Sequence, residues 1–343
     1  MSPSLRTRPL TGVLLAGAAV ALALGLGVGL GPTTVPLWSA ITSMLDRLPF
    51  VAMESGLTEA QEAILWELRL PRTVLGMLVG GLLAIAGGAY QGVFRNPLAD
   101  PYLLGVAAGA GLAATLGITT GLATTNTLPL WAFLGALGGV ALTYALGASV
   151  GRGHSTTVLI LAGVAVASFL TAAQTFVQQR NAETLREVYS WILGRLTTVG
   201  WDEVLTLLPY AAVSSVGLVV MRRLLDVLGV GDDEAVALGV PVTRVRVAIL
   251  VLASLGTAAA VAASGLIAFV GLVVPHAVRM LAGSSYRVIL PMSLAFGGAF
   301  LVFADLLART LVAPSELPIG VVTAFFGAPF FALILRSAGT ARA

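Results

Sequence analysis

The sequence predicts an all-α integral membrane protein, on the strength of its composition and of its long uncharged stretches. Of the 343 residues, 57% are hydrophobic and 10% are charged, and the mean hydropathy is +0.97. Soluble globular domains carry about 25% charged residues, so this composition excludes a soluble enzyme, a nucleic-acid-binding module and a disordered protein. The chain contains no cysteine, which excludes disulfides, thiolate nucleophiles and cysteine-ligated metals.

The uncharged stretches predict about ten spanning helices, because each crossing needs about 20 mostly apolar residues. Two stretches are too long for one helix: we expect 101–151 to divide at 119–129, and 247–278 to break near Ser264-Gly265 and Pro275. The other expected helices are 10–31, 73–94, 156–179, 204–221, 288–304 and 317–335. The first exceeds the ~7–15 apolar residues of a signal peptide, so a retained helix is favoured over a cleaved leader.

The charges between these helices predict the orientation and a single transmembrane domain over 1–343. All 19 basic residues are arginine, and 12 lie on segments that face inward if the N-terminus is cytoplasmic, against 7 outside. Positively charged loops favour the cytoplasmic side. We therefore expect an inner-membrane protein with both termini cytoplasmic, an extracytoplasmic segment at 32–70 and a cytoplasmic segment at 222–246.

The 40 glycines concentrate in the expected spans, where small residues allow helices to pack closely. We expect most of them to serve packing, and the remainder to form hinges or broken helices that face a transport pathway. A weak internal echo, with Ala-x-x-Gly ten residues before a proline in both 83–97 and 261–275, fits either duplicated halves or chance.

The cytoplasmic segment contains a predicted short helix, because two glycines bracket the run DDEAVAL. Its three acids would lie in the first turn, where they suit the positive end of the helix dipole. One interpretation is a loop that only caps two spans. The other is a helix that docks in a groove of a cytoplasmic partner, formed by Gly231, Asp232, Asp233, Glu234, Ala235, Val236, Leu238 and Gly239.

Arg69, Arg72 and Arg309 fall on the expected outer face, against the orientation rule. An acidic extracellular partner would explain them, since arginine pairs carboxylates bidentately; snorkelling to the interface is the alternative. Asp305 is the acid that interrupts a span. Such a carboxylate suggests function, but pairing with Arg309, four residues on, is the favoured interpretation.

We predict neither a metal site nor a catalytic site. The two histidines, His154 and His276, are 122 residues apart and have no acidic neighbours, whereas metal ligands cluster. Without lysine the chain cannot contain the phosphate-binding motif GxxxxGK[ST], so ATP would have to bind to another chain.

Four segments together resemble one protein family. LRLPRTVLGMLVGG (68–81), GVFRNPLADPYLLGVAAGAG (92–111), SGLIAFVGLVVPHAVRML (264–281) and ELPIGVVTAFFGAPFF (316–331) are similar to motifs of the iron-chelate and cobalamin uptake permeases. These permeases are the transmembrane subunits of type II ABC importers. The resemblance covers nearly the whole chain.

The resemblance implies a ten-helix subunit that works as a homodimer with two cytoplasmic ATPase subunits, which bind ATP and Mg²⁺, and with an extracytoplasmic substrate-binding protein. It implies that the segment from Gly231 to Gly239 couples to the ATPase and that the three outer arginines dock the binding protein. The implied cavity lies between two copies and is lined by the fifth and tenth helices. The implied cytoplasmic gates are formed by Asn96, Leu98, Ser155, Thr156 and Thr157.

The function expected from the resemblance is ATP-driven import of a ferric siderophore or related iron chelate, with no cofactor in this chain. Haem or cobalamin import by the same mechanism is the alternative. A secondary transporter driven by an ion gradient through Asp305 is a more remote alternative, and an intramembrane enzyme lacks any paired acid, Ser–His or metal constellation.

Overall fold

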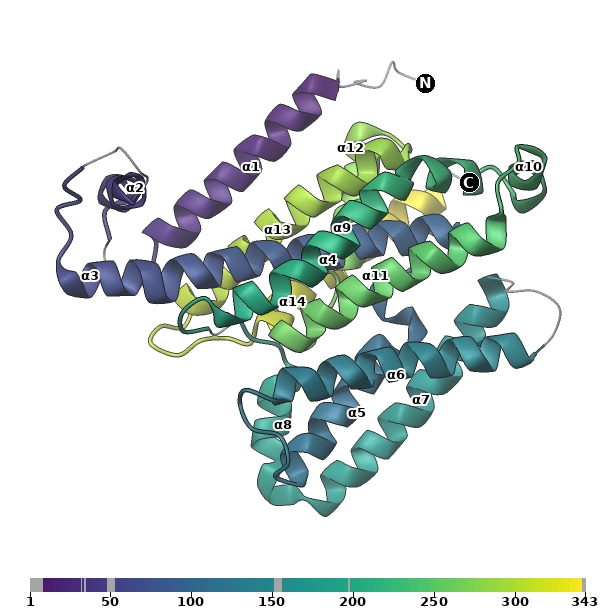
Figure 1. The fold of residues 1–343 in the computed structure, drawn as a ribbon, viewed down its shortest axis with the longest axis horizontal. Helices are drawn as coiled ribbons and strands as arrows, with labels where there is room; N and C mark the ends of the chain where they lie inside the picture. Colours follow the sequence, from purple (N-terminus) through teal and green to yellow (C-terminus); the bar gives the residue numbers. More distant parts are fainter. Residues whose placement is uncertain are drawn as a thin grey trace.

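The computed structural model describes residues 9–31, 33, 35–47, 53–150, 156–196 and 198–340, and these ranges form helices and no strand (Figure 1). Along the chain the helices are α1 (Pro9–Gly29), α2 (Leu37–Asp46), α3 (Glu59–Ala63), the π-helix η1 (Ile64–Arg69), α4 (Leu70–Val93), the 3-10 helix η2 (Pro101–Leu104), α5 (Val106–Thr119), α6 (Leu128–Ser149), α7 (Thr156–Arg180), η3 (Ala182–Thr184), α8 (Leu185–Ile192), α9 (Asp202–Leu228), α10 (Asp232–Ala237), α11 (Val242–Ser264), α12 (Val270–Ala282), α13 (Tyr286–Thr310) and α14 (Ile319–Thr340).

The all-α membrane class is confirmed, because seven helices of the described chain are long and apolar enough to cross a bilayer. They are α1, the continuous α3–η1–α4, α6, α7, α9, α11 and α13. Three shorter apolar helices, α5, α12 and α14, fall at the remaining predicted spans. The predicted break after Ser264 is confirmed, whereas Pro275 lies inside α12 and does not break it.

The C-terminal part of the predicted extracytoplasmic segment 32–70 is helical, and its placement outside the membrane stays a prediction. A helix begins at Glu59 and continues through η1 into α4 without a gap. Its start is fixed by a capping box, in which Thr58 accepts from the backbone of Gln61 and the Gln61 side chain bonds back to Thr58. Pro71 lies in the first turn of α4, and the wider π-turn of η1 directly before it gives the chain room to pass the proline without ending the helix.

The centre of the larger helix group is α4, which packs against α9, α11, α12 and α13 (Figure 1). In its most apolar window 83% of the residues are buried, against 28% for α6, α7 and α9. Of the helices around α4, α11 and α13 are 61% buried by the same measure, and α9 leaves most of its surface for lipid or for other protein. The core between them is aliphatic, with Leu75, Leu82, Ile289 and Leu301 fully buried.

Glycines bring the central helices into contact, as the sequence predicts. A Cβ built on Gly87 would lie 1.9 Å from the carbonyl oxygen of Gly271 in α12, and one on Gly80 would lie 2.2 Å from the carbonyl oxygen of Gly297 in α13. No other residue fits at either crossing without separating the backbones. Close approach of this kind drives helix association where the surrounding solvent is hydrocarbon.

A second group of helices, α5 to α8, lies beside the first, and the two groups meet mainly where α6 packs on α11 (Figure 1). The internal echo does not fall on equivalent elements: 83–93 is continuous helix in α4, whereas 261–275 contains the non-helical break between α11 and α12. The repeated pattern therefore carries no support for related halves.

Candidate functional site

Chemistry-bearing side chains gather at the two ends of the helix bundle, which we call the α10 end and the α3 end. At the α10 end, the predicted short helix is present as α10, between Gly231 (φ 151°) and Gly239 (φ 79°). Asp232, Asp233 and Glu234 occupy its first turn. Positive φ values favour glycine, so these two glycines set the sharp turns by which the chain leaves α9 and enters α11.

Three apolar side chains project from this segment. Val230, Val236 and Leu238 are 66%, 62% and 68% exposed, while Ala235 between them is fully buried. Helix α10 is therefore held to the bundle on one side and presents an apolar tip on the other. An exposed apolar tip beside charged residues is typical of a protein–protein contact.

Asp232 joins three segments at this end. Both its carboxylate oxygens accept hydrogen bonds from Nη2 of Arg246 in α11, each at 2.9 Å, and Nη2 of Arg95 lies 3.1 Å from its Oδ1. Arg95 follows directly after α4. The hydrogen bonds from Arg246, and then the charges of the two arginines, hold the pKa of Asp232 below its ordinary value.

The loop after Arg95 contains the first predicted gate. Asn96 folds the loop on itself by accepting, through Oδ1, from the backbone of Leu98 at 3.0 Å, and Leu98 is exposed. Farther along, the hydroxyl of Tyr102 donates to the carbonyl of Ile267 and accepts from its N–H, at 2.9 and 3.0 Å. The gate loop is thus tied to α10 through Arg95 and to the break between α11 and α12 through Tyr102.

The second predicted gate is only partly described, because Ser155 lies outside the described residues, as does His154. Thr156 begins α7, where Thr157 is exposed. Helix α7 packs on η2, which follows the first gate loop: a Cβ on Gly163 would lie 2.0 Å from the carbonyl oxygen of Leu103. The two predicted gates are therefore carried by elements in direct contact.

At the α3 end the structure brings the three predicted docking arginines together, but two of them are buried. Arg69 donates through Nη1 to the carbonyls of Val28 and Gly29, at 2.8 and 3.2 Å, and through Nη2 to that of Thr33. Arg309 donates to the carbonyl of Gly27 at 2.6 Å. These acceptors include the last carbonyls of α1, which lack partners within the helix and lie at its negative end.

Arg72 is engaged by two acids. Its Nε and Nη2 donate to Asp305 at 2.7–3.1 Å, and its Nη1 and Nη2 donate to Glu316 at 3.0 and 2.9 Å. The predicted pair of Asp305 with Arg309 is present at 3.6 Å, yet Arg72 is the nearer partner. Sequence reasoning missed this contact because 233 residues separate the two positions, and it missed Glu316 for the same reason.

Docking of a partner by these three arginines stays a prediction. In this structure Arg69 and Arg309 bind the end of α1, so either would have to leave its acceptors before it could reach a partner's carboxylate. Arg72 is different, since one of its two partners, Glu316, is exposed. Removing a buried guanidinium from its hydrogen bonds is costly, which favours Arg72 over the other two as a docking group.

An open apolar cavity of about 640 Å³ lies against α14, the tenth of the apolar helices. Its walls are the end of α8, the break between α11 and α12, and one face of α14; the lining residues are Ile192, Leu193, Leu266, Ala268, Gly320, Val321, Ala324, Phe325, Ala328 and Pro329. Phe325 is 78% exposed at its edge. The resemblance placed a cavity on the fifth and tenth helices; α14 lines this one, while α7 contributes no lining residue to it.

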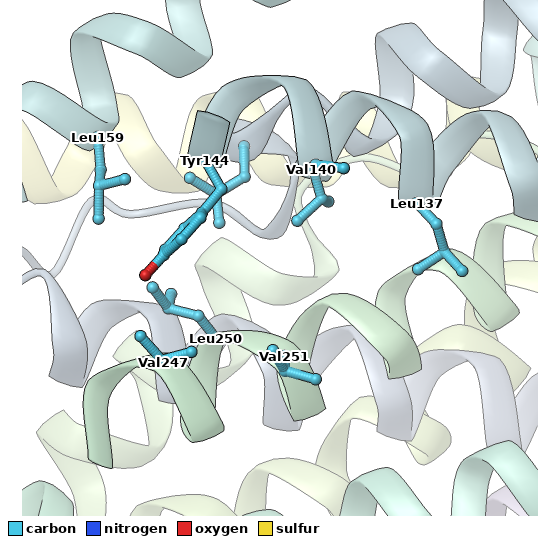
Figure 2. A pocket seen from close by; sticks show the side chains of 9 residues that line it. Leu137, Val140, Tyr144, Leu159, Val247, Leu250 and Val251 are labelled. Carbon is cyan, nitrogen blue, oxygen red and sulfur yellow. The ribbon is translucent and has the colours of Figure 1, made fainter. Parts of the chain in front are cut away.

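A smaller apolar cavity of about 250 Å³ marks the seam between the two helix groups (Figure 2). Leu137, Val140 and Tyr144 of α6 face Val247, Leu250 and Val251 of α11 across it. Well-packed interiors leave few such voids. The seam is therefore filled less tightly than the glycine crossings around α4.

The sequence and the fold are similar to those of known proteins. The FecCD transport family matches residues 14–337. A cobalamin import system permease protein of Halobacterium salinarum is 41% identical over 301 residues, which cover 87% of this chain and 79% of that protein. An Fe(3+)-citrate import system permease protein of Bacillus subtilis is 37% identical over 294 residues, covering 86% and 87%.

Among solved structures, a metal-chelate type ABC transporter in an inward-facing conformation superposes with a TM-score of 0.83, at 27% identity, covering 95% of this chain and 98% of that one. The fold and its two ends thus define a multi-pass transport subunit of the membrane. The chain belongs to the FecCD transport family; it is an ABC importer permease and not an enzyme.

Proposed function

We propose that this permease imports a ferric siderophore or related iron chelate, as a homodimer with two cytoplasmic ATPase subunits and an extracytoplasmic binding protein. The apolar tip of α10, on a chain of this family, carries the proposal. Relatives named for ferric citrate and cobalamin import support the chelate and keep haem and cobalamin as alternatives. ATP and Mg²⁺ would bind to the ATPase subunits, since this chain has no lysine for a phosphate-binding loop.

The apolar tip supports the assignment of α10 to ATPase coupling. Val236 and Leu238 are exposed on a rigid turn that both glycines and the Asp232 ion pairs hold in place. Apolar anchors on a fixed scaffold lose little entropy on docking. Asp233 and Glu234, which are exposed beside them, would supply the charged rim of the contact.

The cavity against α14 supports a pathway between two copies. It is open on one side, and Phe325, which lines it, is exposed. A second copy that placed its own α14 opposite would close this apolar wall into a channel wide enough for a large chelate. An even number of crossings, ten, would place the start of α1 and the end of α14 on the same side of the membrane. Both point toward the α10 end (Figure 1), and the arginine bias would make this side cytoplasmic.

Transport would proceed by alternating access. A loaded binding protein would dock at the α3 end. Arg72 would be its main contact, because Glu316, one of the two acids that bind Arg72, is exposed and could release it most easily. ATP binding would move α10, and Asp232 would pass the movement to the loop of Asn96 and Leu98 through Arg95. The gate at 155–157 would follow through η2 and α7.

The coupling assignment is tested by changing the apolar tip. Val236→Asp with Leu238→Asp should abolish co-purification of the ATPase subunits and ATP-driven uptake in reconstituted vesicles. The matched control is Leu122→Asp, an equally exposed leucine in the loop after α5, which should leave both unchanged. Retained ATPase association in the double variant would overturn the assignment.

The energy source and the substrate are tested in the same vesicles. Uptake should require ATP and survive collapse of the proton gradient; the reverse result would favour a secondary transporter. Ferric siderophore, haem and cobalamin, each presented with its binding protein, should compete unequally, and transport of cobalamin alone would replace the iron-chelate assignment.

A further inference from the structure

Helix α2, at the α3 end, turns its apolar side away from the protein. Leu37, Trp38, Ile41 and Met44 are 46%, 70%, 38% and 37% exposed. Their spacing places them on one face of the helix, because residues three, four and seven apart share a face. The exposed part of this face carries no charge.

The polar side of α2 faces inward instead. Ser43 is buried and accepts a hydrogen bond from Nε1 of Trp66 at 3.0 Å. Thr42 is also buried and bonds to carbonyls within the helix. At the end of the helix, the Arg47 guanidinium lies 3.8 Å from the Trp66 ring centroid. Ser43 and Arg47 thus hold α2 against Trp66 of η1.

This arrangement is the reverse of a helix on a water-exposed surface, where the apolar stripe faces the core and the polar face meets water. Water on the exposed face of α2 would solvate an isoleucine, two other aliphatic chains and a tryptophan. The arrangement is stable only if something apolar covers that face.

The position of α2 identifies the cover. It follows α1 after a short connection, and Val28 of α1 shares a buried cluster with Val35 and Ala40. The lipid-facing surface of α1 continues through Leu30, which is exposed, to Leu37. Figure 1 shows α2 nearly end-on, whereas α1 and α4 run across the picture, so α2 lies across the direction of the spanning helices.

We propose that α2 is an interfacial helix, with Leu37, Trp38, Ile41 and Met44 inserted into the lipid leaflet at the α3 end. Amphipathic helices that lie in the plane of the membrane bury their apolar face at the boundary between headgroups and acyl chains. Tryptophan is enriched at this depth. Lipid fits the face better than a protein partner because the face is uncharged and continues the lipid-facing surface of α1.

The test uses the absence of cysteine from the chain. Spin labels are attached to the single variants Ile41→Cys and Met44→Cys in lipid nanodiscs. Collision rates are measured with oxygen, which concentrates in lipid, and with a water-soluble nickel chelate. The references are Leu22→Cys on the exposed face of α1 and Glu59→Cys on the exposed start of α3. All four positions are more than one-third exposed, so labelling does not perturb the core.

Labels at 41 and 44 should show an oxygen-to-nickel ratio several-fold above that at 59 and below that at 22, because 22 lies deeper in the hydrocarbon. A ratio like that at 59 would mean that the face meets water and would overturn the proposal. Protection from both reagents would overturn it too, because a second copy or the binding protein would then cover the face. Quenching of Trp38 fluorescence by brominated lipid, taken as the difference from Trp38→Phe, gives an independent reading. None of these results depends on transport.

Discussion

Asp305→Asn is the substitution that tests the buried charge cluster at the α3 end most directly. The carboxylate accepts three hydrogen bonds from Arg72, at 2.7, 3.0 and 3.1 Å, and lies 3.6 Å from Nε of Arg309. The side chains of Asp305 and Arg309 are 6% and 7% exposed. Asparagine keeps the shape but removes the negative charge and turns an N–H₂ group toward a guanidinium.

The expected loss of stability follows from this desolvation. Removing one partner of a buried ion pair costs about 3–5 kcal/mol, because the other charge is left uncompensated. Arg72 keeps Glu316 and Arg309 keeps the carbonyl of Gly27, so we expect the lower end, about 3 kcal/mol. At about 2 °C per kcal/mol for a large domain, thermal unfolding of the purified permease, followed by intrinsic fluorescence, should shift down by about 6 °C.

The matched control is Glu316→Gln, which removes a charge from the same arginine at an exposed position. It should cost less than about 1 kcal/mol, as exposed ion pairs do. Equal shifts for the two variants would refute the desolvation argument. If Asp305→Asn instead abolished uptake at unchanged stability, the carboxylate would have a role in transport, as the secondary-transporter alternative requires.

Three other outcomes follow from the contacts. Gly87→Ala should lower the free energy of unfolding by about 1–3 kcal/mol, because its Cβ would lie 1.9 Å from a backbone oxygen of α12. Gly138→Ala, with open space around it, should leave the stability unchanged. Equal effects of the two variants on thermal unfolding would contradict the packing role. Arg69→Gln should speed hydrogen exchange at the end of α1, because the last carbonyls of that helix lose a charged donor, and unchanged exchange there would contradict the clamp. Arg246 holds the pKa of Asp232 below its ordinary value. The bond between them therefore contributes stability above pH ~4 and is lost as pH falls through the lowered pKa. The hydrogen-exchange protection of the α10 amides should not change from pH 5 to 8 after correction for intrinsic rates, and a transition inside that range would refute the assignment.

The sequence was sufficient to predict the fold class, most helix positions and the short helix between two glycines. Those features depend on local properties: the length of uncharged stretches, the breaks at glycine and the charges at helix ends. It was wrong at Pro275, which was expected to break a helix and lies inside α12. The acids of 59–67 lie on the first turns of a helix that continues into α4, where acids favour a helix N-terminus.

The long-range contacts could not be predicted from one sequence. Arg72 and Asp305 are brought together by the packing of α4 on α13. The hydrophobic pattern of a helix shows which face is buried but does not show which other helix covers it. The packing of α1 against η1 and α4 brings Arg69 to the end of α1. From the sequence, Arg69 on an outer segment indicated a group that docks a partner. In the structure the unsatisfied carbonyls at the end of α1 bind the same guanidinium.

The two ends of the molecule use arginine in opposite ways, and the difference indicates where movement enters. At the α3 end, buried guanidinium groups join α1, α4 and α13, and separating them would leave charges without water or partners. At the α10 end, the Asp232 and Arg95 side chains are 42% and 41% exposed, so water can replace their contact at little cost. Contacts at the α10 end can therefore adjust to a displacement at less cost than the buried contacts at the α3 end. If α10 moves as proposed, we expect the movement to enter at its own, solvated end, while the buried arginines keep α1, α4 and α13 together at the α3 end.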